Sequence, residues 1–377
     1  EPATIHKVSG RPETHMLREI CEQPDAVRRA LRTNASVARS IADEVVRRGV
    51  QVIVLAGRGT SDHAALYAQY LLQHLTGIPV ALATASVYTL FGAPFHLRQA
   101  LVIGISQSGE SPDIVEVVRQ SRQAGAFTVA VTNQRESPLA AAADETLFCA
   151  AGPEQSVAAT KTYTTTCAVL ALLAASLPGG ERVLPHIQRL PDLMQAALAT
   201  EDAVARAVVR YVHARDCIVL GRGFQYSTAR EAALKLEETC YVIAMPFSSA
   251  DFRHGPAALV ERGLPVMLFA PPGKTAADSL ALLGWLHERG ADCIVMAEDS
   301  YLLEQATTAI ALDLPRLEDV TDSSLRQGVD SEGVRVDELL APLSYIVPGQ
   351  FFAYFLAIEK GLDPDQPRGL SKVTYTR

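Results

Sequence analysis

An internal duplication constrains the fold of this chain more than any other feature of its sequence. Residues 217–223 (Cys-Ile-Val-Leu-Gly-Arg-Gly) repeat the pattern of residues 52–59 (Val-Ile-Val-Leu-Ala-Gly-Arg-Gly), and the corresponding glycines, Gly57 and Gly221, lie 164 residues apart. Each copy then continues through a helix-like segment into further short apolar runs. A repeat of this length indicates two copies of one α/β domain rather than a solenoid of short repeats.

Short apolar runs alternate with amphipathic segments in both copies. In the first copy, the predicted strands are residues 51–56, 80–85, 101–105, 127–131 and 145–150. In the second copy, the corresponding runs are residues 217–220, 264–269, 293–296 and 309–314. Strands that alternate with helices predict the α/β class, with parallel sheets covered by helices on both faces.

Helices are expected around these sheets. Two helices separated at Pro24-Asp25 are predicted between Met16 and Val45, a third at residues 160–177 and a last one at residues 344–360. The expected organisation is an N-terminal segment (residues 1–30), a first domain (31–185), a second domain (195–355) and an extended tail (356–377).

The composition argues against several classes of protein. Hydrophobic residues make up 48% of the 377 residues, as in folded proteins, and the net charge of −8 argues against a nucleic-acid partner. The six cysteines form no CxxC pair, as expected for buried thiols in a reducing cytosol. The histidines do not cluster with other metal ligands, so no metal or other cofactor is expected. Without a signal peptide or a long uninterrupted apolar run, we expect a cytoplasmic protein with no membrane partner.

The hydroxyl-rich sequence Ser-Gln-Ser-Gly-Glu-Ser occupies residues 106–111, between a predicted strand and a helix that begins near Pro112. Backbone N–H groups at a helix N-terminus are free to bind an anion, and serine hydroxyls add donors. The stretch therefore predicts a phosphate site, with an ordinary serine cap of the helix as the alternative. In the second copy, residues 270–275 are Ala-Pro-Pro-Gly-Lys-Thr; because proline removes donors, the anion site is assigned to the first copy.

A dinucleotide-binding loop is a competing interpretation of the sequence Gly57-Arg58-Gly59. That motif needs a third glycine three residues later, and Asp62 stands there instead. The sequence therefore argues against a dinucleotide cofactor.

Three charged residues of the second copy, Glu231, Lys235 and Glu238, have the spacing that puts them on one face of a helix. A solvated row of ion pairs is the ordinary explanation. The helix is otherwise apolar, however, and a carboxylate beside a lysine in an apolar cleft is suited to moving protons. His254 lies on a Gly-Pro turn and is either catalytic or an ordinary turn residue. Lys372 lies in the C-terminal tail and is either catalytic or a solvated surface residue.

Several motifs together resemble the isomerase half of the glutamine–fructose-6-phosphate amidotransferase family, which is built from two sugar-isomerase (SIS) domains. The resemblance runs from about Met16 to the C-terminus, and it implies that each domain is a flavodoxin-like three-layer sandwich with a parallel five-stranded sheet. The matching motifs are Glu19-Ile20-Cys21-Glu22-Gln23-Pro24, Gly59-Thr60-Ser61, residues 106–110, Gly152-Pro153-Glu154, Val157-Ala158, Thr160-Lys161, Ala233-Leu234-Lys235-Leu236 with Glu238, His254-Gly255-Pro256 and residues 365–370.

The resemblance also implies a role for each matching residue. Glu238 would move a proton between C1 and C2 of a sugar, assisted by Lys235 with Glu231 beside it. His254 would reach in from the other subunit of a homodimer to open the sugar ring, and Lys372 would sit over the open chain, where it could form an imine with a ketose carbonyl. The residues that would hold the 6-phosphate are Ser106, Gln107, Ser108 and Ser111, with Thr60 and Ser61 close by. Val157 and Ala158 would touch the sugar through their backbone groups.

One departure from the family shapes the expected reaction. The synthase carries an N-terminal glutaminase domain that releases ammonia, and this sequence contains none; its tail after Lys372 also differs. The resemblance therefore favours the deaminase reaction of stand-alone SIS enzymes, from glucosamine 6-phosphate to fructose 6-phosphate and ammonia. The alternatives are a separate isomerase half of a synthase, a deglycase for another amine-linked sugar phosphate, or a non-enzymatic sugar-phosphate sensor, against which the retained charged residues speak.

Overall fold

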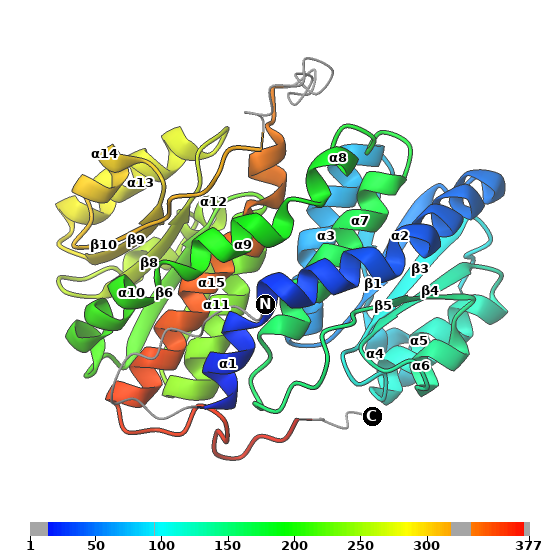
Figure 1. The fold of residues 1–377 in the computed structure, drawn as a ribbon, viewed down its shortest axis with the longest axis horizontal. Coiled ribbons are helices and arrows are strands. Elements are labelled where there is room, and N and C mark those ends of the chain that lie inside the picture. Colours follow the sequence, from blue (N-terminus) through cyan, green and yellow to red (C-terminus); the bar gives the residue numbers. More distant parts are fainter. Residues whose placement is uncertain (1–13, 94, 318–332, 373–377) are drawn as a thin grey trace.

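Two parallel sheets of the same design form the framework of the protein (Figure 1). The structure is a computed structural model that describes residues 14–93, 95–317 and 333–372. The strand order is β2-β1-β3-β4-β5 in the first sheet and β10-β9-β8-β6-β7 in the second. With β6 in the place of β1 and β7 in the place of β2, the two orders are the same. The predicted duplicated α/β fold, with two five-stranded sheets, is confirmed.

The strands follow the apolar runs of the sequence. Those of the first sheet are Val52–Ala56 (β1), Val80–Leu82 (β2), Ala100–Ile105 (β3), Phe127–Thr132 (β4) and Glu145–Phe148 (β5). Those of the second sheet are Asp216–Gly221 (β6), Ile243–Ser248 (β7), Pro265–Ala270 (β8), Asp292–Ala297 (β9) and Thr308–Ala311 (β10). All six residues of β3 are buried, as expected for a central strand with both faces covered.

Helices cover both faces of each sheet. The first domain contains α2 (Gln23–Arg48), α3 (Thr60–Thr76), α4 (Ala85–Thr89), α5 (Pro112–Gln123), α6 (Pro138–Ala142) and α7 (Lys161–Ser176). The second contains α9 (Leu190–Leu198), α10 (Glu201–Ala207), α11 (Gln225–Cys240), α12 (Ser249–Phe252), α13 (Ala276–Glu288), α14 (Ser300–Glu304) and α15 (Val336–Glu359). The remaining helical segments are α1 (His15–Cys21), α8 (Leu184–Ile187), η1 (Val208–Tyr211) and η2 (Pro256–Leu259).

The two domains share one hydrophobic core. The outer faces of the sheets pack on α4, α5 and α6 in the first domain and on α12, α13 and α14 in the second. The inner face of the first sheet packs on α2, α3 and α7, and the inner face of the second sheet packs on α9, α11 and α15. The buried residues of all six helices form a single cluster. Contacts between α11 and α3 and between α2 and α9 join the domains directly. This shared core fixes the position of α11 against the first sheet.

The long helix α15 is the centre of that core. By length and composition it is apolar enough to cross a membrane, yet its apolar stretch is entirely buried inside the protein. It packs against α9, α10 and α11 as well as α1 and α7. The helix begins at Val336, not at the predicted residue 344, and it continues through both Pro342 and Pro348. Close packing compensates for the backbone hydrogen bonds that these prolines remove.

One strand, β7, is not among those predicted from the sequence. β7 contains Pro246, which argues against a strand because proline cannot donate to a ladder. The strand lies at the edge of the second sheet, next to β6 only, so the missing donor is tolerated. The boundary expected at residue 30 falls inside the continuous helix α2.

Candidate active site

A cavity of about 340 Å³ lies at the carboxyl ends of the strands of the first sheet, where α11 of the second domain meets it. Ligands of open α/β sheets bind at this edge. Three parts of the chain form the wall. They are the turns after β1 and β3, the segment from Val157 to the first turns of α7, and Glu238 together with Leu370, Ser371 and Lys372 of the tail.

The turn after β3 brings hydrogen-bond donors to this cavity. Ser106 Oγ lies 3.1 Å from Ser111 Oγ, and the N–H of Gly109 donates to Ser106 Oγ over 3.2 Å. Gly109 has a φ of 66°, and a Cβ at this position would lie 2.3 Å from a neighbouring side-chain oxygen, so the turn requires glycine. The turn leads into α5, whose first N–H groups lack intrahelical acceptors, and it is therefore suited to binding an anion.

A second helix begins at the same cavity. α3 starts at Thr60 directly after Gly59, and the side chains of Thr60 and Ser61 line the wall. The positive ends of two helix dipoles, of α3 and α5, therefore lie at one end of the cavity.

The predicted row of charges on α11 is buried beneath the cavity. Lys235 Nζ lies 2.7 Å from a carboxylate oxygen of Glu238 and 3.2 Å from one of Glu231. Glu231 in turn accepts from Thr60 Oγ1 at 3.0 Å and lies 2.7 Å from His63 Nδ1. Lys235 and Glu231 are fully buried, whereas Glu238 is 20% exposed and lines the cavity. The solvated row of ion pairs that the spacing alone suggests is therefore excluded.

Electrostatics keep the buried members of this row charged. Burial favours the neutral amine of Lys235, but the carboxylates of Glu231 and Glu238 outweigh it and raise the pKa of this lysine. Burial acts to raise the pKa of Glu231, but Lys235 and His63 lower it below its usual value. A fixed ammonium group therefore lies directly beside Glu238, whose carboxylate is the one that lines the cavity among the described residues.

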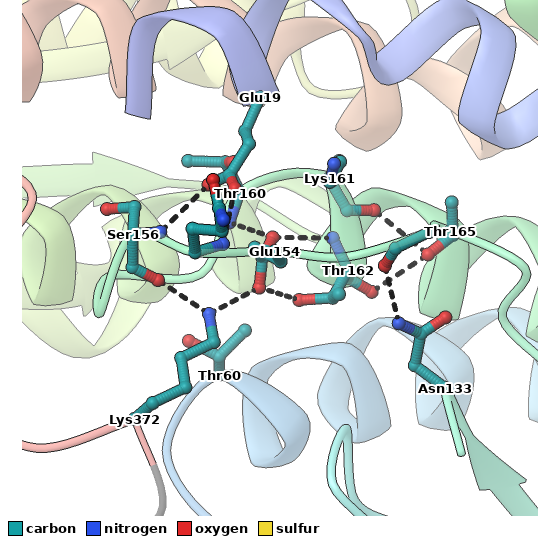
Figure 2. A network of polar contacts seen from close by, with 12 residues as sticks. Glu19, Thr60, Asn133, Glu154, Ser156, Thr160, Lys161, Thr162, Thr165 and Lys372 are labelled. Carbon is teal, nitrogen blue, oxygen red and sulfur yellow. Dashed lines mark hydrogen bonds and ion pairs between the residues drawn. The ribbon is translucent and has the colours of Figure 1, made fainter. Parts of the chain in front are cut away.

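The tail lysine is held by a buried carboxylate. Lys372 Nζ donates to Glu154 Oε2 and to the carbonyl oxygen of Ser156, at 2.7 Å each (Figure 2). Glu154 also accepts from the backbone N–H groups of Thr160 and Thr162 at 3.0 Å and from Thr162 Oγ1 at 2.6 Å. Burial acts to raise the pKa of Glu154, but Lys372 and these donors lower it. The contact keeps Lys372 at the wall of the cavity.

The loop around Ser156 is tied to both ends of the described chain. The carboxylate of Glu19, on α1, accepts from the N–H groups of Gln155 and Ser156, and burial raises the pKa of Glu19 to about 7. The backbone carbonyl oxygen of Asp365, in the tail, accepts the Val157 N–H at 3.2 Å. The carboxylate of Asp365 accepts the N–H groups of His15 and Met16 at the start of α1. The backbone expected to touch the sugar is therefore fixed from two sides.

The other predicted site residues take different positions. Gln107, Ser108 and Val157 line the cavity, whereas Ala158 is buried behind its wall. His254 follows α12 on an exposed turn, where its N–H donates to Asp251 O, and it does not line the cavity of its own chain.

Several residues in or next to this site were not identified from the sequence. Three of them are ionic or imidazole side chains: Arg58, which lines the cavity, Glu154, which contacts Lys372, and His63, which contacts Glu231. Glu154 belongs to a quoted motif, and its place six residues before Thr160 is a usable signal for a carboxylate at a helix N-terminus. Within the described residues, no group of three or more His, Cys, Asp or Glu residues is arranged to hold a metal ion.

Comparison with known proteins identifies the family. The SIS domain model matches residues 48–176 and 211–326. The glutamine–fructose-6-phosphate aminotransferase [isomerizing] of Pyrococcus horikoshii is 38% identical over 368 residues, which cover 96% of this chain and 58% of that protein. The chain thus spans less than two thirds of this relative's length.

Solved structures agree with this assignment. The C-terminal domain of glucosamine-fructose-6-phosphate aminotransferase from Francisella tularensis has a TM-score of 0.79 and 27% identity, and the match covers 96% of this chain and all of that one. Glucosamine-6-phosphate deaminase from Thermotoga maritima shares the fold, with a TM-score of 0.72 and 19% identity over 96% of this chain and all of that one. The chain belongs to the SIS family, as a protein with two SIS domains related to the isomerase half of the aminotransferases.

Proposed function

We propose that this protein is a hexosamine-6-phosphate deaminase that converts glucosamine 6-phosphate and water into fructose 6-phosphate and ammonia by aldose–ketose proton transfer. The observation that carries the proposal is the position of Glu238. Its carboxylate lines the same cavity as the hydroxyls of Ser106 and Ser108, with the buried Lys235 at 2.7 Å. A phosphate bound at the turn after β3 would hold the sugar, while the base acts on its other end.

The proposed reaction begins with the open-chain amino sugar, whose phosphate is held by the donors of α3 and α5. Glu238 removes the proton from C2 and returns a proton to C1, which moves the double bond and leaves an imine at C2. Water adds to this imine, ammonia leaves with the electron pair of the C–N bond, and the ketone of fructose 6-phosphate forms. The ammonium group of Lys235 stabilises the negative charge that develops during proton transfer.

A second candidate is the isomerase part of a glutamine-dependent synthase, which runs toward amino-sugar formation. It is supported by the names of the relatives, such as the Pyrococcus horikoshii aminotransferase, of whose length the match covers 58%. A panel of amino-sugar 6-phosphates, assayed for ammonia and for fructose 6-phosphate, separates the two functions. We expect stoichiometric release of both products from glucosamine 6-phosphate. Amino-sugar formation from fructose 6-phosphate and ammonia, with no ammonia released from any amino-sugar 6-phosphate, would instead support the isomerase part of a synthase.

We also propose that His254 opens the sugar ring in the neighbouring subunit of a homodimer. The exposed position of His254, outside its own cavity, supports this role. Mixing Glu238→Gln with His254→Ala subunits should restore partial activity, because one site of a mixed dimer then has both intact residues. Background activity in mixed dimers verified by mass spectrometry contradicts action across the interface.

The proposed compartment is the cytoplasm. All six cysteines are free thiols, five of them buried, which suits a reducing environment.

A further inference from the structure

Arg58 places a guanidinium group at the phosphate end of the cavity. It follows β1 in the turn that leads to α3, lines the cavity together with Ser106 and Ser108, and leaves 54% of its side chain exposed. We infer that Arg58 binds the phosphate group of the substrate directly and determines the preference for phosphorylated sugars. This inference rests on the proposed function and adds a specificity residue to it.

A buried carboxylate fixes the orientation of Arg58. Its Nε donates to Asp113 Oδ2 at 2.6 Å, and Asp113 is only 2% exposed, in the first turn of α5. The other oxygen of Asp113 accepts the N–H of Ile114 at 2.9 Å, so this carboxylate is itself immobilised. The guanidinium group therefore lies beside the N-terminus of α5, next to the turn that ends at Ser111.

The contact with Asp113 uses only one of the five N–H donors of the guanidinium group. The two terminal NH₂ groups form a planar fork that matches two oxygens of a phosphate. Since Asp113 offsets part of the positive charge, we expect the gain in affinity to come mainly from short, directed bonds to the phosphate oxygens.

Among the described residues, the two lysines at the cavity are each paired with carboxylates. Lys235 lies between Glu231 and Glu238, and Lys372 is paired with Glu154. A phosphate dianion must therefore enter a cavity that contains the carboxylate of Glu238, in a protein with a net charge of −8. Serine hydroxyls supply hydrogen-bond donors but no positive charge. Arg58 supplies a positive charge at the cavity wall, and its two terminal NH₂ groups are available to the phosphate.

The duplicated domain supplies a matched control. Arg222 occupies the position of Arg58 after β6, and its partner Asp278, on α13, occupies the position of Asp113. The Arg222 Nε lies 4.0 Å from Asp278, which also accepts from Arg253 at 2.8 Å. The adjoining turn contains prolines in place of serines. Arg222 thus has the same chain position and similar exposure, but no donor-rich turn beside it.

Calorimetric binding of fructose 6-phosphate and of inorganic phosphate to the full chain tests the inference. Glu238→Gln serves as the background, so that turnover does not interfere. We expect Arg58→Ala to raise the Kd of both ligands about 10- to 100-fold, the range for loss of hydrogen bonds to a charged group. Arg58→Lys should give an intermediate loss, because the charge remains but the fork is absent. Arg222→Ala should stay within about twofold, as for ordinary surface substitutions.

The outcomes separate this inference from the proposed function. An Arg58→Ala chain that binds as well as Arg222→Ala overturns the role of Arg58, whatever the reaction is. Arg58-dependent phosphate binding by a chain that is inactive on every amino-sugar phosphate supports the role and contradicts the deaminase. Asp113→Asn is the second variant, because it keeps the arginine and releases its orientation; we expect a smaller loss of affinity, and an unchanged Kd would contradict the orienting contact.

Discussion

The two SIS domains have the same strand order, yet the turn after the third strand is open in one and filled in the other. In the first domain this turn faces the cavity with its serine hydroxyls. In the second domain the carboxylate of Glu338, from the first turn of α15, occupies the corresponding place. It accepts the N–H of Lys274 at 3.1 Å, and a Cβ on Gly273 would lie 2.4 Å from its oxygen. The protein's own carboxylate therefore stands where the first domain leaves room for an anion.

The difference shows how a duplicated fold divides its tasks. Burial raises the pKa of Glu338. The N–H groups of Lys274 and Thr275 act in the opposite direction, and this lowering is what is expected for a carboxylate at a helix N-terminus. The second domain thus closes its own anion site and contributes α11, which carries the charged row under the cavity of the first domain. One domain supplies donors for an anion, and the other supplies the groups suited to proton transfer.

The largest expected effect tests the contribution of the second domain. Glu238→Gln keeps the shape of the side chain and removes the base, so we expect the rate to fall by about 10²–10⁴ while ligand binding remains. Exchange of the C2 proton with deuterated water measures this step. Glu237→Gln, on the exposed side of the same helix, is the control and should be active. Nearly normal exchange in Glu238→Gln would mean that another residue is the base.

The next effect tests the contribution of the first domain. Ser106→Ala combined with Ser108→Ala should weaken binding by about 3 kcal/mol, roughly a hundredfold in KM, because each bond to a charged group contributes about 1.5–3 kcal/mol. Thr275→Ala in the filled turn of the second domain is the matched control, with an expected change in KM within about twofold. An unchanged KM in the double variant rules out the turn after β3 as the phosphate site.

A smaller effect tests the filled turn itself. Glu338→Ala leaves the partly buried N–H groups of Lys274 and Thr275 without their carboxylate acceptor, so the free energy of unfolding should fall by about 1–3 kcal/mol with KM unchanged. Glu338→Gln retains an acceptor oxygen and should lose less. Added sulfate should raise the Tm of Glu338→Ala more than that of the wild-type protein. If sulfate raises both equally, the turn of the second domain is not an anion site filled by Glu338.

The smallest effect concerns Glu19, which holds the loop around Ser156 beside the cavity of the first domain. Because its pKa is raised to about 7 in the folded protein, the stability that it contributes is complete below about pH 4.5 and is lost as the pH rises through about 7. The Tm of the wild-type protein should therefore fall relative to Glu19→Gln between pH 5 and pH 8. We expect a difference on the order of 1 kcal/mol, since contact with solvent reduces the effect. Parallel pH profiles of the two proteins would argue against a raised pKa.

Much of this fold is predictable because its signals are local. Apolar runs identified nine of the ten strands, and the helical spacing of Glu231, Lys235 and Glu238 correctly placed them on one face. β7 was missed because Pro246 is tolerated only at a sheet edge, and edge position is not a local property. The early start of α15 was missed because burial, which the sequence does not display, offsets the cost of Pro342, which lies before the predicted start.

The contacts of the candidate site are less predictable because they join distant parts of the chain. Lys372 and Glu154 are 218 residues apart, and Glu231 and His63 are 168 apart. No spacing rule relates such pairs. The contact of Glu338 with the second turn was equally inaccessible: the prolines there predict a poor anion site, but they do not indicate that a carboxylate from another helix lies against this turn.

The central position of α15 also has a consequence for how the protein is made. Every strand of both sheets precedes this helix in the chain, so the ribosome delivers them before the helix that completes their common core. Until α15 emerges, the apolar inner faces of α9 and α11 have no partner on that side. The second domain therefore cannot complete its core during translation until α15 has emerged. The nascent chain must remain soluble with its core open, and any product that stops before Val336 exposes that surface to aggregation and to chaperones.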